Sequence, residues 1–88
     1  MLSGKTTTGF EFEIDEKRAD DMELLEALAL ADTNRAHFPK VLSMLLGDEQ
    51  KAKLYEHCRT EKGNVPIQKT IEEFLEIMSI SGEKLKNS

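Results

Sequence analysis

The chain has 88 residues, of which 39% are hydrophobic and 33% charged, and its formal net charge at pH 7 is −5. A chain of this length forms one domain and buries roughly 60–70% of the surface of its unfolded state, so its core is small. The acidic balance argues against a nucleic-acid partner, because phosphate binding depends on clustered Lys and Arg.

The sequence carries no sign of a membrane or secreted protein. No apolar run approaches the roughly 18–20 residues that span a bilayer, and no basic segment with an apolar run opens the chain. Cys58 is the only cysteine, so no internal disulfide is expected. We therefore expect a single cytoplasmic domain over residues 1–88 with no membrane partner.

The first 15 residues contain the one strand signal of the chain. Phe10, Phe12 and Ile14 alternate with acidic residues, which places three large apolar groups on one face of a strand. A turn at Gly9 would fold residues 5–8 back as a second strand. Because an isolated hairpin is marginal in water, we expect the apolar face to cover a helical layer or another subunit.

A first helix is expected to begin near Asp20 or Asp21 and to end near Thr33. Asp20 and Glu23 have the spacing of a capping box, with Asp in place of the usual Ser or Thr. At 100° per residue, the predicted apolar side consists of Leu24, Leu25, Leu28, Ala29 and Ala31. Leu30 falls on the acidic side and lies outside this stripe.

Two short helices are expected next, separated by Gly47. The first covers Pro39–Leu46, because Pro suits the first turn of a helix and Gly suits a left-handed stop. Its predicted stripe consists of Phe38, Val41, Leu42, Leu45 and Leu46. The second has Asp48 as its N-cap and ends near Arg59, before a turn at Gly63-Asn64.

The last helix is expected to run from Pro66 to about Ser81 and to stop at Gly82. Its stripe, opposite three glutamates, consists of Ile67, Ile71, Phe74, Leu75 and Met78. Burying five such side chains is worth about 8–15 kcal/mol gross, so the stripe is expected to meet the core or a partner. A polar, flexible tail is expected over residues 82–88. The predicted fold is therefore mainly α: a small four-helix domain with helices in 20–81 and a short N-terminal β-strand or hairpin in 1–15.

No pattern in the chain predicts catalysis, a metal or a cofactor. His57 and Cys58 are neighbours on a predicted helix, so their side chains point about 100° apart and suit no nucleophile pair. A structural zinc site takes about four ligands, and His37 is the only further His or Cys. We expect no enzyme, no catalytic, metal or cofactor-binding residue, and Cys58 as a small core residue.

Several blocks of the sequence resemble the tail assembly chaperones of long-tailed, siphovirus-type phages and prophages of Gram-positive bacteria. Their order and spacing carry the resemblance, which covers the chain from Gly9 to about Ile80. The blocks are Gly9–Asp15, Asp20–Leu24, Leu45–Gln50 with Leu54-Tyr55, and Gly63–Pro66.

The resemblance implies a non-catalytic protein. Such a chaperone binds the phage tape measure protein and keeps it soluble during tail assembly in the host bacterial cytoplasm, and it is absent from the mature virion. The resemblance also implies weak self-association and a longer, frameshifted form that would reach the tail tube protein. Leu85-Lys86-Asn87 can be encoded by UUA-AAA-AAC, which contains the slippery run A-AAA-AAC. An ordinary polar tail is the alternative.

Apolar residues with no place in the predicted core supply the candidate contact surfaces. The expected self-association residues, on the strand, are Phe10, Phe12 and Ile14. The expected client-contact residues, off the main stripes of their helices, are Leu30, Ile77 and Ile80. A place at the margin of the core is the alternative for the last three. The alternative function is a small acidic prophage regulator or anti-host protein that acts by protein–protein binding.

Overall fold

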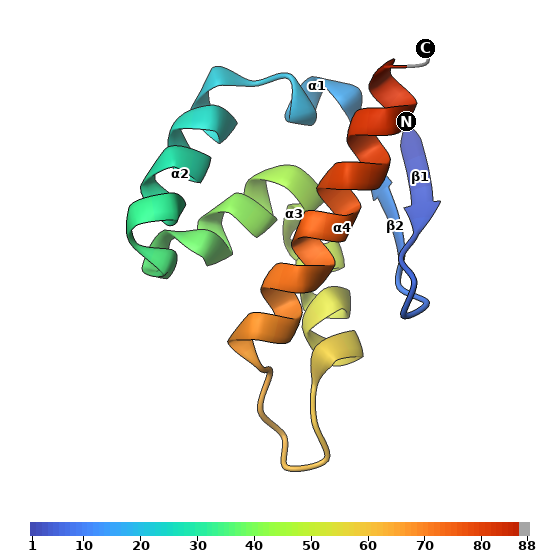
Figure 1. The fold of residues 1–88 in the computed structure, drawn as a ribbon, viewed down its shortest axis with the longest axis vertical. Helices are drawn as coiled ribbons and strands as arrows, with labels where there is room; N and C mark the ends of the chain where they lie inside the picture. The colour runs from blue at the N-terminus through green and yellow to red at the C-terminus, as the bar shows by residue number, and fades with distance from the viewer. Residues whose placement is uncertain (87–88) are drawn as a thin grey trace.

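The computed structural model describes residues 1–86 and confirms a mainly α fold with an N-terminal hairpin (Figure 1). In chain order the elements are β1 (Leu2–Lys5), β2 (Glu11–Ile14), α1 (Glu16–Ala19), α2 (Met22–Thr33), the 3-10 turn η1 (Arg35–His37), α3 (Phe38–Cys58) and α4 (Ile67–Lys86). The short elements α1 and η1 were not predicted.

The hairpin places its apolar face against the helices. β1 and β2 are antiparallel, with Leu2 opposite Ile14 and Lys5 opposite Glu11. Residues 6–10 connect the two strands. The strand that pairs with β2 is therefore residues 2–5, earlier in the chain than the predicted residues 5–8. The alternating side chains of residues 10, 12 and 14 are all buried. The sequence predicts that this apolar face packs on a helical layer or on another subunit, and in the structure it packs on the chain's own helices.

Helix α2 begins and ends where the sequence predicts. The N-cap is Asp21 and not Asp20, whose capping-box spacing with Glu23 predicted that role. The carboxylate of Asp21 accepts a hydrogen bond from the Glu23 N–H at 2.9 Å. The predicted apolar side is only partly correct: Leu24 is buried, but Leu25 is 56% exposed. The helix packs mainly against α3 and η1, so only a narrow strip of its surface is covered.

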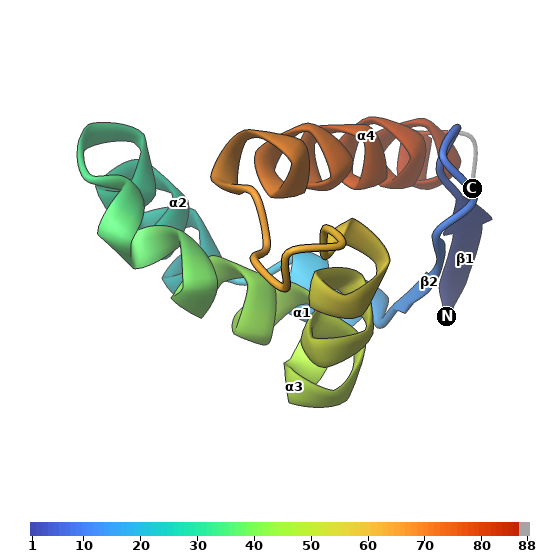
Figure 2. The same ribbon diagram turned by 90° about the horizontal axis from the view of Figure 1, so that it is seen from below.

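Helix α3 is divided into two arms by Gly47, as expected. Gly47 has φ 82° and ψ 158°, a conformation that is essentially restricted to glycine. A Cβ atom at this position would also lie 2.9 Å from a guanidinium nitrogen of Arg18. The two arms therefore run in different directions, the first along α2 and the second beneath α4 (Figures 1 and 2).

Helix α4 differs from its prediction at its end and in its buried face. It passes through Gly82 and ends at Lys86, so the flexible tail was wrong for residues 82–86, while residues 87–88 lie outside the described part. The side chains that it buries are Thr70, Glu73, Phe74, Ile77 and Ser81. Two members of the predicted stripe face outward instead, because Ile67 is 53% and Leu75 59% exposed.

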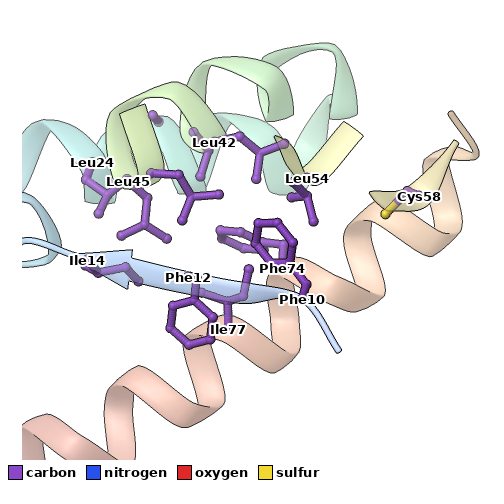
Figure 3. Packing of buried hydrophobic residues seen from close by; sticks show 13 residues of the cluster. Phe10, Phe12, Ile14, Leu24, Leu42, Leu45, Leu54, Cys58, Phe74 and Ile77 are labelled. Atoms are coloured by element: carbon purple, nitrogen blue, oxygen red, sulfur yellow. The ribbon is translucent and has the colours of Figure 1, made fainter. Parts of the chain in front are cut away.

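One apolar core joins the hairpin and the three long helices. In Figure 3, Phe12, Phe74 and Ile77 lie close together, with Leu45 of α3 and Leu24 of α2 on the opposite side. Cys58 is fully buried near the end of the second α3 arm, which confirms its expected core role. Within residues 1–86, no helix is both long enough and apolar enough to cross a membrane.

Candidate partner-binding surfaces

A polar cluster ties the hairpin turn to α4. Glu73 is only 3% exposed, and its carboxylate accepts hydrogen bonds from the hydroxyls of Thr6 and Thr8, each at 2.9 Å. The Thr8 Oγ1 atom also lies 2.9 Å from His57 Nε2. Because the single Thr8 proton goes to Glu73, Nε2 must carry the proton that it donates to Thr8. One turn further along α4, Glu76 accepts from both the N–H and the hydroxyl of Thr7.

The geometry of this cluster is that of a structural clamp. In a catalytic triad, the carboxylate and the hydroxyl contact different nitrogens of the imidazole ring. Here the Glu73 carboxylate lies 3.9 Å from His57 Nε2, the same nitrogen that contacts Thr8. A buried carboxylate needs hydrogen-bond donors, and the two threonines supply them. The clamp therefore explains why Glu73 faces inward and why α4 is rotated from its predicted orientation.

The described residues offer no assembled metal site. Among them, no group of three or more His, Cys, Asp or Glu side chains is placed to hold an ion. Burial raises the pKa of the Cys58 thiol above its ordinary value, which disfavours the thiolate at neutral pH.

The expected self-association residues are used inside the chain. Phe10, Phe12 and Ile14 are 5%, 2% and 0% exposed, so their side chains cannot pair subunits in this fold. The outer edge of β2 is also occupied, because the side-chain amide of Gln50 bonds both the N–H and the C=O of Glu13, at 2.8 and 2.6 Å. Self-association stays a prediction, but these side chains do not supply its surface.

The three expected client-contact residues have different positions. Leu30 is 52% exposed, as its place outside the stripe predicts. Ile77 is completely buried, so of its two expected roles the place in the core is the one found, and its side chain cannot contact a client in this fold. Ile80 is half-buried against the core, where its Cγ2 atom would lie 3.0 Å from a Cβ atom at Gly4. Only Leu30 remains a candidate contact with a large exposed surface.

An apolar cleft opens between the start of α3, its second arm and the start of α4. It has a volume of about 580 Å³, and its walls include Phe38, Pro39, Tyr55, Val65 and Ile67. Phe38 is fixed by an edge-to-face contact with Phe74, whose ring centroid lies 5.2 Å away. Because the cleft is lined mainly by carbon and has Ile67 exposed at its margin, it suits an apolar side chain of another polypeptide.

The outward face of α2 carries a second apolar surface. Met22 is 68% and Leu25 56% exposed, and Ala29 is exposed as well. Their spacing of three and four residues places them in one line along the helix. We call these three residues the α2 seam. Leu30 lies to one side of it, at a small cleft of about 200 Å³ that also includes Glu23, Glu26, His37 and Lys40.

The charge around the α2 seam is entirely acidic in sequence. Residues 20–33 hold five acidic and no basic residues, and the other 12 of the chain's 17 acids are matched by its 12 Lys and Arg. This one segment therefore accounts for the whole net charge of −5. Within the described residues, no ion pair uses a carboxylate of this segment. The overall composition hid this feature, but counting charge by predicted helix would have found it.

Comparison of the chain with protein-family models, curated proteins and solved structures finds no match. The resemblance to tail assembly chaperones therefore depends on the sequence blocks alone and stays a prediction.

Proposed function

We propose that this protein is a non-catalytic phage tail assembly chaperone that binds the tape measure protein and keeps it soluble during tail assembly. One observation carries the proposal: large apolar side chains stay exposed although the core of the chain is closed. Leu25, Leu30, Ile67 and Leu75 are all more than half exposed. Together with the sequence blocks, these surfaces favour a protein that is completed by another polypeptide.

The chemistry of the two surfaces fits a helical, apolar client. The apolar cleft beside the start of α4 has room for single apolar side chains of a client. The α2 seam presents its own three apolar side chains in a line at helical spacing, which suits contact with a client helix. A chaperone must cover its client without aggregating, and a chain that is 33% charged meets this requirement. The host bacterial cytoplasm is the proposed location, with the protein absent from the mature virion.

Co-expression with the tape measure protein of the same phage tests the proposal. The wild-type chain is expected to move that protein from the insoluble to the soluble fraction and to co-purify with it. Ile67→Asp should reduce this effect because it places a charge at the margin of the apolar cleft. Gln68→Asp is the matched control, since it adds the same charge at the next, exposed position of α4.

Both variants should fold like the wild type by circular dichroism, because both positions are exposed. A tape measure protein that stays insoluble beside the wild-type chain would contradict the proposed function. The gene gives an independent test of the longer form: a slippery run at the codons for Leu85-Lys86-Asn87, followed by an overlapping −1 frame, is expected.

A further inference from the structure

We propose that α2 is the docking element of this protein and that its partner segment is a basic, amphipathic helix. The inference deepens the proposed function and depends on it for the identity of the client. It is carried by two independent features of one helix: an exposed apolar seam and a local excess of negative charge whose carboxylates make no ion pair within the described residues.

The α2 seam has the geometry of one side of a two-helix contact. Met22, Leu25 and Ala29 occupy successive a and d positions of a heptad pattern, and all three are exposed. The small side chain at Ala29 lets a second helix approach closely. A helix of 12 residues is about 18 Å long, so the contact covers nearly two heptads of the partner. Such a short contact is weak alone and gains specificity from the charges beside it.

The charges beside the seam select a basic partner. Glu26 flanks the seam on one side and Asp32 continues its line, and neither makes an ion pair within the described residues. Asp21 caps the helix and adds negative charge at its start. Lys40 lines the small cleft beside Leu30 together with Glu23 and Glu26, but it makes no ion pair with either within the described residues. A partner helix with Lys or Arg beside an apolar stripe would pair with these carboxylates.

A second copy of this chain is a poor occupant of the same surface. Two α2 helices that met along their seams would bring two acidic segments together, and like charges oppose such a contact. The rest of the chain is neutral in formal charge, so a basic helix would be drawn to the segment of residues 20–33, which contains α2.

A designed peptide tests the inference without the tape measure protein. The probe is a synthetic helix of about three heptads with Leu at a and d and Lys at e and g, and its control has Glu in place of Lys. Titration of the full chain with each peptide, followed by fluorescence anisotropy, should show at least about tenfold weaker binding of the acidic peptide. Added salt should weaken binding of the basic peptide.

Two sets of variants distinguish the effect of the α2 carboxylates on binding from the effect of the chain's overall net charge. The triple variant Glu23→Gln, Glu26→Gln and Asp32→Asn should weaken binding of the basic peptide about tenfold, at roughly 0.3–1 kcal/mol for each lost charge. The control variant Glu61→Gln, Glu72→Gln and Glu83→Gln removes the same charge from exposed positions elsewhere and should leave binding within about twofold. Equal losses in the two variants would overturn the inference, because binding would then follow net charge alone.

The apolar half of the inference has its own matched pair. Leu25→Gln should weaken binding about tenfold, whereas Leu75→Gln, at a similarly exposed position of α4, should not. An unchanged affinity for Leu25→Gln would overturn the inference. So would a change in the sedimentation coefficient of the chain alone on replacing residues of α2, because the occupant would then be a second copy.

Co-expression separates a failure of the inference from a failure of the proposed function. If the wild-type chain solubilises the tape measure protein and the α2 triple variant does so equally well, α2 is not the docking element although the chaperone function stands. If the wild-type chain binds the basic peptide through α2 but leaves the tape measure protein insoluble, the docking element stands and the proposed client is wrong.

Discussion

Helices α2 and α4 carry the same kinds of residue and use them in opposite ways. Both combine large apolar side chains with several carboxylates. In α4, Glu73 and Glu76 bond the hairpin turn, and Phe74 and Ile77 lie in the core. In α2, the carboxylates beyond its N-cap make no bond within the described residues, and Leu25 faces outward.

Helix α4 therefore shows that a helix can be held in a small domain through its acidic side as well as its apolar side. Helix α4 contacts both β1, near its C-terminal end, and the second α3 arm, which lies beneath it (Figure 2), so more than one side of the helix is covered. Helix α2 lies at the edge of the fold and packs mainly on α3 and η1. The free energy of folding should therefore depend on α4 more than on α2, and α2 is free to serve binding.

The largest expected effect comes from the core position of α4. Ile77→Ala removes a completely buried side chain and should lower the free energy of unfolding by about 2–5 kcal/mol. Urea denaturation followed by circular dichroism measures the change. Leu75→Ala in the same helix is the control and should cost less than about 1 kcal/mol, because Leu75 is mostly exposed. Equal losses would mean that the buried face of α4 is incorrectly assigned.

A comparison of glutamates tests the clamp directly. Glu73→Ala leaves the hydroxyls of Thr6 and Thr8 without their acceptor, and it should lower the free energy of unfolding by about 2–3 kcal/mol. Glu26→Ala in α2 removes the same group from an exposed position and should change stability by no more than about 0.5 kcal/mol. Similar results for the two variants in thermal or urea unfolding would remove the distinction between these helices.

The elements of the fold could be predicted from local sequence patterns, but the clamp between the hairpin turn and α4 could not. Local signals predicted most of the fold: the alternation in residues 10–14 indicated the strand, and Gly47 indicated the break in α3. The start of α2 was predicted within one residue, although the cap is Asp21 and not Asp20. Helical periodicity failed in α4 because Glu73 was assigned to the solvent side. The donors that bring it inside, Thr6 and Thr8, lie more than 60 residues earlier in the chain. No local pattern reveals such a pairing.

The candidate surfaces were predictable only in part. Leu30 was recognised because it disagreed with the apolar stripe of its helix, and it is exposed. Ile77 was placed off the main stripe of α4, which is rotated from its predicted orientation, while Leu25 was assigned to the core. Whether the stripe of a short amphipathic helix is fully covered depends on how many neighbours pack against it. That number follows from the tertiary arrangement and not from the helix's own sequence.

Two glycines should respond to the same substitution with opposite signs. Gly47→Ala forces a side chain into a backbone conformation reserved for glycine and towards Arg18, and it should cost about 1–2 kcal/mol. Gly47 lies where the α3 arm along α2 meets the arm along α4, so the cost would confirm that this backbone conformation joins the two arms. Gly82→Ala adds a methyl group in open space within α4 and should stabilise the chain by about 0.5–1 kcal/mol. Destabilisation by Gly82→Ala would instead indicate that the helix ends at Gly82, as the sequence predicts.

The smallest expected effect is a loss of stability at alkaline pH on the α4 side of the molecule. Burial raises the pKa of the Cys58 thiol in the folded chain, whereas the unfolded chain loses this proton near the ordinary value of 9.0. Above that pH, ionisation of the thiol stabilises the unfolded state, whereas the folded state keeps its proton up to a higher pH. The contribution of Cys58 is therefore fully present below about pH 8 and is lost as the pH rises through 9 towards the raised pKa.

Cys58→Ala isolates this contribution. The variant loses some packing at every pH, so the informative quantity is the change in the free energy of unfolding between pH 8 and pH 10. The wild type should lose more of its free energy of unfolding than the variant over this interval, measured by urea denaturation. Burial also raises the pKa of Tyr55 from 10.0, and Tyr55→Phe should alter only the part of the curve above that pH. Identical curves for wild type and Cys58→Ala would mean that the thiol reaches water in the folded state, and the core beneath α4 would then be as open as the outer side of α2.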